Sequence, residues 1–285
     1  MQAVDPIFVA PRLVQRDWGR TDIGGWLGTR PAEPVAEAWV IDSANATDAG
    51  PFGRRIARQP GGVLGDLGRA PPRLRMVFPG RDTTIKSTSP LSFWTILEPG
   101  VASLARPHGL FHRTGERLRA YEGAEIALAE GAVAVEVSAS FLGTNEADTG
   151  PHLVRLPPVS TRMRATLFRD SCLSVETWSL PEWSRIVPDG ETCHVMMALD
   201  PGIAVDGRPL KPGEAVLAPA CGRPLDLVTE RQNARILVAY PDQTPTTVWR
   251  HTPGPDPAAG QLPKPAPRQP LVWAGANLHL PAEAA

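Results

Sequence analysis

The stretch that decides the fold is TTIKSTSPLSFWTILEPG, residues 83–100. Two short segments rich in β-branched and aromatic residues flank a Ser/Pro-rich middle, and this pattern predicts two β-strands joined by a turn. The first strand carries Lys86, one of only three lysines in a chain that otherwise takes its positive charge from Arg. A Lys inside an otherwise uncharged strand indicates either a functional ammonium or one that neutralises a nearby carboxylate.

Short apolar, β-branched segments between turn signals recur on both sides of this stretch, as is typical of an all-β sandwich or barrel. The segments are AEAWVID, LRMVFPG, GAVAVEVSAS, SCLSVETWSL, HVMMALDPG, EAVLAPA and ARILVAYP. The 32 prolines and 26 glycines are spread throughout the chain and disfavour long helices. We therefore predict helix only at residues 114–121, which are rich in Arg and Glu, and near residues 62–67.

The length of 285 residues suffices for one large domain or two small ones with a substantial core. The formal net charge of -1 argues against a nucleic-acid or membrane-surface partner held by bulk electrostatics. No apolar run approaches the roughly 20 residues that span a bilayer, and the N-terminus lacks secretory features, so we expect a cytoplasmic protein. Cys172, Cys193 and Cys221 are too scattered for a disulfide framework and are expected to be reduced thiols.

The polar, proline-bearing segment NEADTGPHLVRLPP predicts a boundary in the middle of the chain. We predict an N-terminal β-unit over residues 1–150, a C-terminal β-unit over 151–241 and a Pro-rich tail over 242–285. The tail ends with LVWAGANLHL, whose apolar side chains are expected to dock on the body or on a partner chain. A homodimer is therefore one open alternative for the assembly.

Two blocks of the sequence resemble class I mannose-6-phosphate isomerases. The first is PIFVAPRLVQRDWGRTDIGGWLG followed by PVAEAWVID, in which Trp18, Gly19, Glu37 and Trp39 fall at matching positions. The second is LDPGIAVDGRPLKPGEAVLAPACGRPLDLV followed by ARILVAYP, which is similar to that family's C-terminal cupin. The resemblance spans residues 6–241 in consistent order and implies a double cupin, with two β-barrel units in one chain.

The resemblance also implies an aldose–ketose isomerase that acts on a sugar phosphate with a zinc ion held by Gln, His, Glu and His. A metal ion on the sugar oxygens would lower the barrier to the enediolate. At the matching positions this chain has Lys86 for the Gln and Thr88 for the first His. Ser92 stands for the Glu and Ile126 for the second His. The sequence therefore predicts no metal site and no zinc cofactor, although the family would have one.

Some features of the family's site are retained, and they define a metal-independent candidate. Trp94 is kept, and Glu136 matches a family Glu in the following strand. We predict Lys86 and Glu136 as candidate catalytic residues, with the ammonium stabilising a bound anion or an enolate. The alternative is that Lys86 pairs with Glu98 or Glu136, or extends to the barrel mouth.

The candidate substrate-binding residues have hydroxyl, aromatic, imidazole or guanidinium groups that suit a sugar or its phosphate. They are Thr88, Ser92, Trp94, His194, Arg54 and Arg55. Arg113, Arg117 and Arg119 form a second Arg cluster, and both clusters are equally compatible with solvated faces. His108 and His112 have a four-residue spacing that suits two metal ligands on a helix, but Pro107 and Gly109 argue against helix there.

Three functions follow from these observations. The first is a divergent enzyme of the mannose-6-phosphate isomerase type that acts on a sugar, sugar phosphate or similar small polar molecule without zinc. The second is a non-catalytic relative that binds such a molecule or regulates a partner. The third is an aldose–ketose isomerase whose metal site has moved elsewhere.

Overall fold

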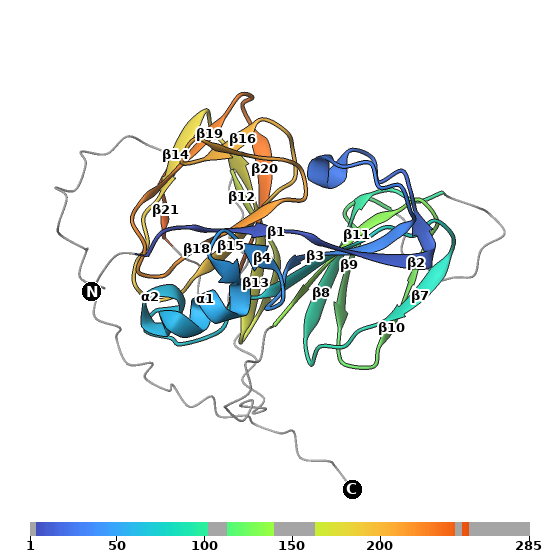
Figure 1. Ribbon diagram of the computed structural model, residues 1–285, viewed down its shortest axis with the longest axis horizontal. Coiled ribbons are helices and arrows are strands. Elements are labelled where there is room, and N and C mark those ends of the chain that lie inside the picture. The colour runs from blue at the N-terminus through green and yellow to red at the C-terminus, as the bar shows by residue number, and fades with distance from the viewer. Residues whose placement is uncertain (1–3, 102–112, 140–162, 243–246, 251–285) are drawn as a thin grey trace, which may run out of the picture.

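The computed structural model describes residues 4–101, 113–139, 163–242 and 247–250, which fold mainly as antiparallel β-sheets (Figure 1). The helical elements in these ranges are the 3-10 turn Trp26–Gly28 and two short α-helices, α1 (Phe52–Arg58) and α2 (Pro60–Leu64). No helix among these residues is long and apolar enough to cross a membrane.

The N-terminal barrel is built from a six-stranded sheet and a two-stranded sheet. The six-stranded sheet has, in spatial order, β2 (Arg12–Arg20), β3 (Val35–Ile41), β6 (Arg73–Val77), β11 (Val133–Ser138), β8 (Ser92–Glu98) and β9 (Arg117–Ala120). The two-stranded sheet pairs β10 (Glu125–Leu128) with β7 (Thr83–Lys86). A cluster of buried apolar residues lies between the two sheets inside this barrel, with Ile85 and Ile126 from one sheet and Trp94 and Ile96 from the other.

The C-terminal barrel is built from an eight-stranded sheet and a five-stranded sheet. The eight-stranded sheet has, in order, β12 (Arg164–Asp170), β13 (Leu173–Leu180), β20 (Ala234–Tyr240), β15 (His194–Ala198), β18 (Ala215–Ala218), β1 (Ile7–Ala10), β4 (Ala46–Thr47) and β5 (Gly50–Pro51). The five-stranded sheet has β17 (Arg208–Leu210), β16 (Ile203–Val205), β19 (Leu225–Thr229), β14 (Trp183–Ile186) and β21 (Trp249–Arg250).

The largest apolar core joins the six-stranded sheet to the eight-stranded one. It contains Val135 and Val137 of β11 together with Val175 of β13 and Val195 of β15. Because successive side chains of a strand point to opposite faces, each central strand contributes one set of residues to this shared core and the alternate set to its own barrel interior. Both faces of these strands are consequently buried.

The first strand of the chain belongs to a sheet that is made mostly by strands from the second half of the chain. Ile7 of β1 lies opposite Leu217 of β18, and Val9 of β1 lies opposite Thr47 of β4. Figure 1 shows β1 within the body that contains β18, whereas β2 lies in the body that contains β3. The predicted boundary segment and the Pro-rich tail fall outside the described residues, apart from the start of the tail, so the domain division stays a prediction.

The all-β fold predicted from the sequence is confirmed, and each quoted apolar segment forms a strand. The helix expected at residues 114–121 is wrong, because residues 117–120 form β9 and pair with β8. The short helix expected near residues 62–67 is α2, which begins and ends slightly earlier. Helix α1 was not predicted, although Phe52 and Ile56 give it one apolar side.

Candidate functional site

Four polar or aromatic residues form one row across the inner face of the six-stranded sheet. Trp39 of β3 lies opposite Arg75 of β6, and Arg75 lies opposite Glu136 of β11. Glu136 in turn lies opposite Trp94 of β8. The row places one guanidinium and one carboxylate inside the N-terminal barrel, between two indole rings.

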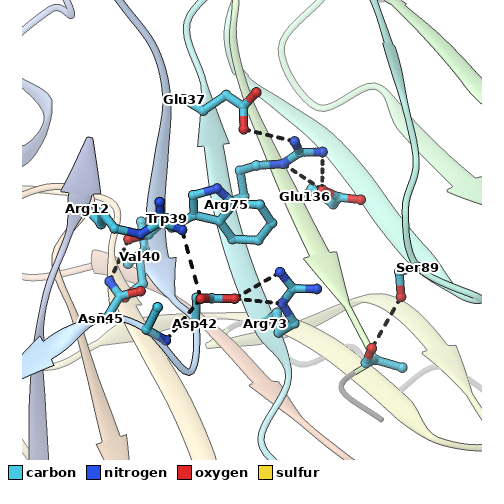
Figure 2. A network of polar contacts seen from close by, with 12 residues as sticks. Arg12, Glu37, Trp39, Val40, Asp42, Asn45, Arg73, Arg75, Ser89 and Glu136 are labelled. Carbon is cyan, nitrogen blue, oxygen red and sulfur yellow. Dashed lines mark hydrogen bonds and ion pairs between the residues drawn. The ribbon is translucent and has the colours of Figure 1, made fainter. Parts of the chain in front are cut away.

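Arg75 binds two carboxylates at once, as Figure 2 shows. Its Nε donates to Glu136 Oε2 at 2.8 Å, and its Nη1 donates to Glu37 Oε2 at 3.0 Å. The guanidinium carbon also lies 5.0 Å from the Trp39 ring and 5.5 Å from the Trp94 ring. All three charged residues are buried. Their mutual pairing offsets the free-energy cost of removing each charge from water.

Glu136 is only partly satisfied by this arrangement. Its Oε2 accepts from Arg75, but its Oε1 is buried and has no hydrogen-bond partner. Burial raises the pKa of Glu136, and the charge and hydrogen bond of Arg75 only partly oppose that rise. The carboxyl group therefore has one free oxygen and a raised proton affinity, which are properties of a general acid or base or of a hydroxyl acceptor.

A second ion-pair group lies beside the row, at the end of β3. Asp42 accepts from Arg73 Nε at 3.0 Å and lies 3.9 Å from Arg12 Nη2 (Figure 2). The Arg73 guanidinium stacks 4.5 Å from the Trp39 ring, on which Arg75 also packs. Trp39 therefore lies between the buried Arg75 and the partly exposed Arg73, and Asp42 links Arg73 to Arg12.

Serine hydroxyls occupy the neighbouring part of the barrel interior. Ser92 Oγ accepts from Trp94 Nε1 at 3.1 Å and lies 3.0 Å from Ser87 Oγ. Ser87 and Ser92 are both buried. This hydrogen-bond chain fixes the indole of Trp94 against Arg75 and gives the interior a polar side.

Lys86 does not join this group. Its side chain is 71% exposed, and its Nζ lies 3.6 Å from Glu125 Oε1 on β10, so neither Glu98 nor Glu136 is its partner. The interior residues on this side are instead Ile85 and Ser87. Lys86 and Thr88 therefore lie on the outer face of this stretch, because successive side chains of an extended chain point to opposite faces.

The remaining candidates are spread over the molecule. Thr88 is exposed, whereas Ser92 and Trp94 lie in the barrel interior beside Glu136. Arg54 is exposed on α1, and Arg55 on the same helix pairs with Asp48. His194 is buried in the C-terminal barrel. His108 and His112 lie outside the described residues. The structure thus brings together three of the candidates, Ser92, Trp94 and Glu136.

The residues of this barrel do not fit the zinc that the family resemblance implies. Zinc prefers imidazole, thiolate and carboxylate ligands, but the inward positions near Glu136 carry serine hydroxyls and indoles. The two carboxylates that do reach the interior are paired with Arg75, which occupies them with a fixed cation. Within the described residues, no group of three His, Cys, Asp or Glu is arranged to hold a metal ion.

Comparisons with solved structures show which proteins share this architecture. A proposed mannosephosphate isomerase from Archaeoglobus fulgidus superposes with a TM-score of 0.60 at 15% identity, over 85% of this chain and 99% of that one. The mannose 6-phosphate isomerase of Bacillus subtilis gives 0.55 at 15% identity, over 84% and 99%. The apo enzyme of Salmonella typhimurium gives 0.57 at 11% identity, over 84% and 100%.

These likenesses show the fold. The chain is an all-β protein of the cupin type, as its sequence predicted. No protein-family profile matches the sequence, and no curated protein matches it.

Sequence reasoning missed Arg75 and the role of Glu37 as its second partner. A signal was present in RLRMV, where Arg alternates with Leu and Met and places two guanidiniums on one face of a strand. The partner Glu136 lies on β11, which is not adjacent to β6 in the sequence, so the pair becomes visible only in the folded sheet.

Proposed function

We propose that the protein binds a small polar molecule of the sugar or sugar-phosphate class in the N-terminal barrel, with Arg75 and Glu136 at the centre of the site in place of zinc. The observation that carries this proposal is the free Oε1 of Glu136, a buried carboxylate oxygen beside a fixed guanidinium. A hydroxyl donated by a ligand would satisfy it. The cupin fold shared with mannose 6-phosphate isomerases supports the class of ligand.

The same residues could support proton transfer without a metal. A carboxyl group with a raised pKa can take a proton from a carbon next to a carbonyl and return it to the neighbouring carbon. The Arg75 guanidinium would stabilise the negative charge that develops on the carbonyl oxygen. The indole faces of Trp39 and Trp94 would contact the carbon-bound hydrogens of the sugar ring.

A second candidate is a binding or regulatory protein without catalysis. One observation favours it, because the Arg75 guanidinium is already shared between Glu37 and Glu136 and Lys86 lies outside the barrel. A guanidinium with two carboxylate partners has less capacity to stabilise a third negative charge. Both candidates predict ligand binding near Glu136, and only the first predicts turnover.

The test is a calorimetric titration with mannose 6-phosphate, fructose 6-phosphate and mannose, together with an isomerase assay with and without added zinc. We expect at least one of these probes to bind without metal, and Glu136→Gln to weaken that binding at least tenfold. Glu125→Gln is the matched control, since Glu125 is exposed and pairs only with Lys86 among the described residues. Equal binding by both variants would rule out the Glu136 site, and activity that requires stoichiometric zinc would overturn the metal-free centre.

A further inference from the structure

A row of apolar side chains crosses the outer face of the five-stranded sheet in the C-terminal barrel. Trp183 of β14 lies opposite Val228 of β19. Ala204 of β16 lies opposite Val228 on one side and opposite Pro209 of β17 on the other. Val228 is 43% exposed and Pro209 is exposed, whereas Trp183 and Ala204 are half-buried. Four neighbouring strands therefore form one outer apolar row, which is about 15 Å long.

The burial pattern along these strands shows that the outer apolar row faces away from the barrel core. Leu227 of β19 and Val205 of β16 belong to that core, whereas their chain neighbours Val228 and Ala204 point to the opposite face. No apolar cluster of the described residues includes a member of the row. Figure 1 shows β14 and β21 on the side of this barrel that is remote from β8 and β10, so the β14 end of the row lies away from the N-terminal barrel.

Charged side chains border the outer apolar row on both sides. Arg185 Nε donates to Asp226 Oδ1 at 2.7 Å, and the Arg185 guanidinium carbon lies 5.3 Å from the Trp183 ring. On the other side of the row, Glu230 is exposed. An exposed apolar surface with a polar rim is typical of a site where another segment or protein binds.

The C-terminal segment of the same chain begins at the edge of this sheet. Arg250 of β21 is the last described residue, and it lies opposite Arg185 of β14. The 20 residues 251–270 separate Arg250 from the apolar segment LVWAGANLHL, residues 271–280. A proline-rich chain of that length reaches up to about 60 Å, which is several times the length of the outer apolar row. The covalent connection also gives the segment a high effective concentration at the row.

We propose that residues 271–273, Leu-Val-Trp, dock on the outer apolar row of their own chain. An indole and two aliphatic side chains would leave water together with the row, which is the main favourable term in an apolar contact. The Trp273 ring would pack against the exposed sides of Trp183 and Val228. This contact is independent of the function proposed for the N-terminal barrel.

The test is photo-crosslinking of the full chain with p-benzoyl-phenylalanine at position 273, which keeps an aromatic ring there. We expect crosslinks within a single chain, to peptides that contain Trp183 or Val228. The control has the same photoreactive group in place of Gln261, among the residues that precede the docking segment. We expect at least a fivefold lower crosslinking yield to these peptides from position 261.

A substitution in the row tests whether its apolar surface is what binds. Val228→Glu, made in the chain with the group at position 273, is expected to lower the crosslinking yield at least fivefold, because docking would bury a carboxylate. Val101→Glu is the matched control. It is the same substitution at a side chain that is 54% exposed and follows β8 of the N-terminal barrel. We expect it to leave the yield unchanged.

The other outcomes contradict docking within one chain. Crosslinks that join two chains would overturn the proposal and assign the outer apolar row to a second copy of the protein. Crosslinks confined to other surfaces, the absence of crosslinks, or equal yields from Val228→Glu and Val101→Glu would overturn it as well. If Val228→Glu does not fold, the peptides that are crosslinked in the chain with native β19 decide.

Discussion

Glu136 and Arg75 lie directly opposite each other in the antiparallel pairing of β11 with β6, and their side chains meet inside the N-terminal barrel at 2.8 Å. Glu176 and Arg164 form a comparable pair inside the C-terminal barrel, at 2.6 Å. The two carboxylates differ in their hydrogen bonding. One oxygen of Glu136 has no hydrogen-bond partner, whereas both oxygens of Glu176 accept hydrogen bonds. This difference leads to opposite effects of pH.

Glu136→Gln and Glu176→Gln are expected to change stability with opposite pH dependences. The pKa of Glu136 is raised by burial, so its contribution is greatest below the ordinary carboxyl pKa and declines as pH rises through the raised value. For Glu176, burial alone would raise the pKa, but the charge and hydrogen bond of Arg164 and the hydrogen bonds of Trp178 and Tyr240 together outweigh burial and lower it. Its contribution is present above the ordinary pKa and declines as pH falls through the lowered value. Urea denaturation of both variants across acidic and neutral pH measures this, and parallel trends would contradict it.

Arg75→Met is expected to destabilise the fold by about 3–5 kcal/mol, because it leaves two buried carboxylates without their cation. Arg81→Met is the control, since Arg81 and its partner Asp17 are both exposed and their pair should contribute less than about 1 kcal/mol. Chemical denaturation at neutral pH measures both. Similar losses in the two variants would show that the buried pairing is not what makes Arg75 important.

The arrangement of strands could be predicted from the sequence because each barrel strand has its own apolar signal. GAVAVEVSAS illustrates this, since its valines form β11 and its Glu alternates onto the barrel side. Residues 114–121, which contain β9, misled us, because Arg and Glu favour helix in isolation. In the folded protein residues 117–120 hydrogen-bond to β8 at the sheet edge, where charged side chains are readily solvated.

Lys86→Ala is expected to change stability by less than about 1 kcal/mol and to leave ligand binding in the N-terminal barrel unaltered. The reason is that Lys86 and Glu125 form an exposed pair, which contributes little and is screened by salt. Thermal denaturation at low and high salt, with the titration described above, measures both effects. A clear loss of ligand affinity in this variant would contradict the prediction and show that Lys86 takes part in ligand binding.

The position of Lys86 also shows why the candidate site could be predicted only in part. A strand alternates sides at every residue, so assigning TTIK to the correct strand still leaves two choices of face. Ser92 and Trp94 both lie in the interior, since they are two residues apart on the same strand, and their role in a site stays a prediction. Arg75 could not be paired with Glu136 from sequence, since the contact depends on which strands become neighbours.

His194→Phe is expected to remove a pH dependence of stability between about pH 4 and 6.5. In the wild type the unfolded chain binds a proton at the ordinary His pKa of 6.5, whereas burial lowers the folded pKa to about 4. Stability therefore falls as pH drops through this window, by at most about 1.4 kcal/mol per pH unit from this group. Denaturation curves of the variant should be flatter there by that amount. An unchanged slope would show that His194 titrates normally in the folded state.

The pairing of β1 with β18 has a consequence for how the chain acquires its structure during synthesis. Ile7 of β1 can pair with Leu217 of β18 only after β18 has been synthesised. The strand β1 therefore emerges from the ribosome roughly two hundred residues before this partner strand exists. The apolar side chains of β1 are meanwhile without their β18 cover. Such a long-range closure slows folding and makes the nascent chain a candidate for chaperone capture until the last sheet is complete.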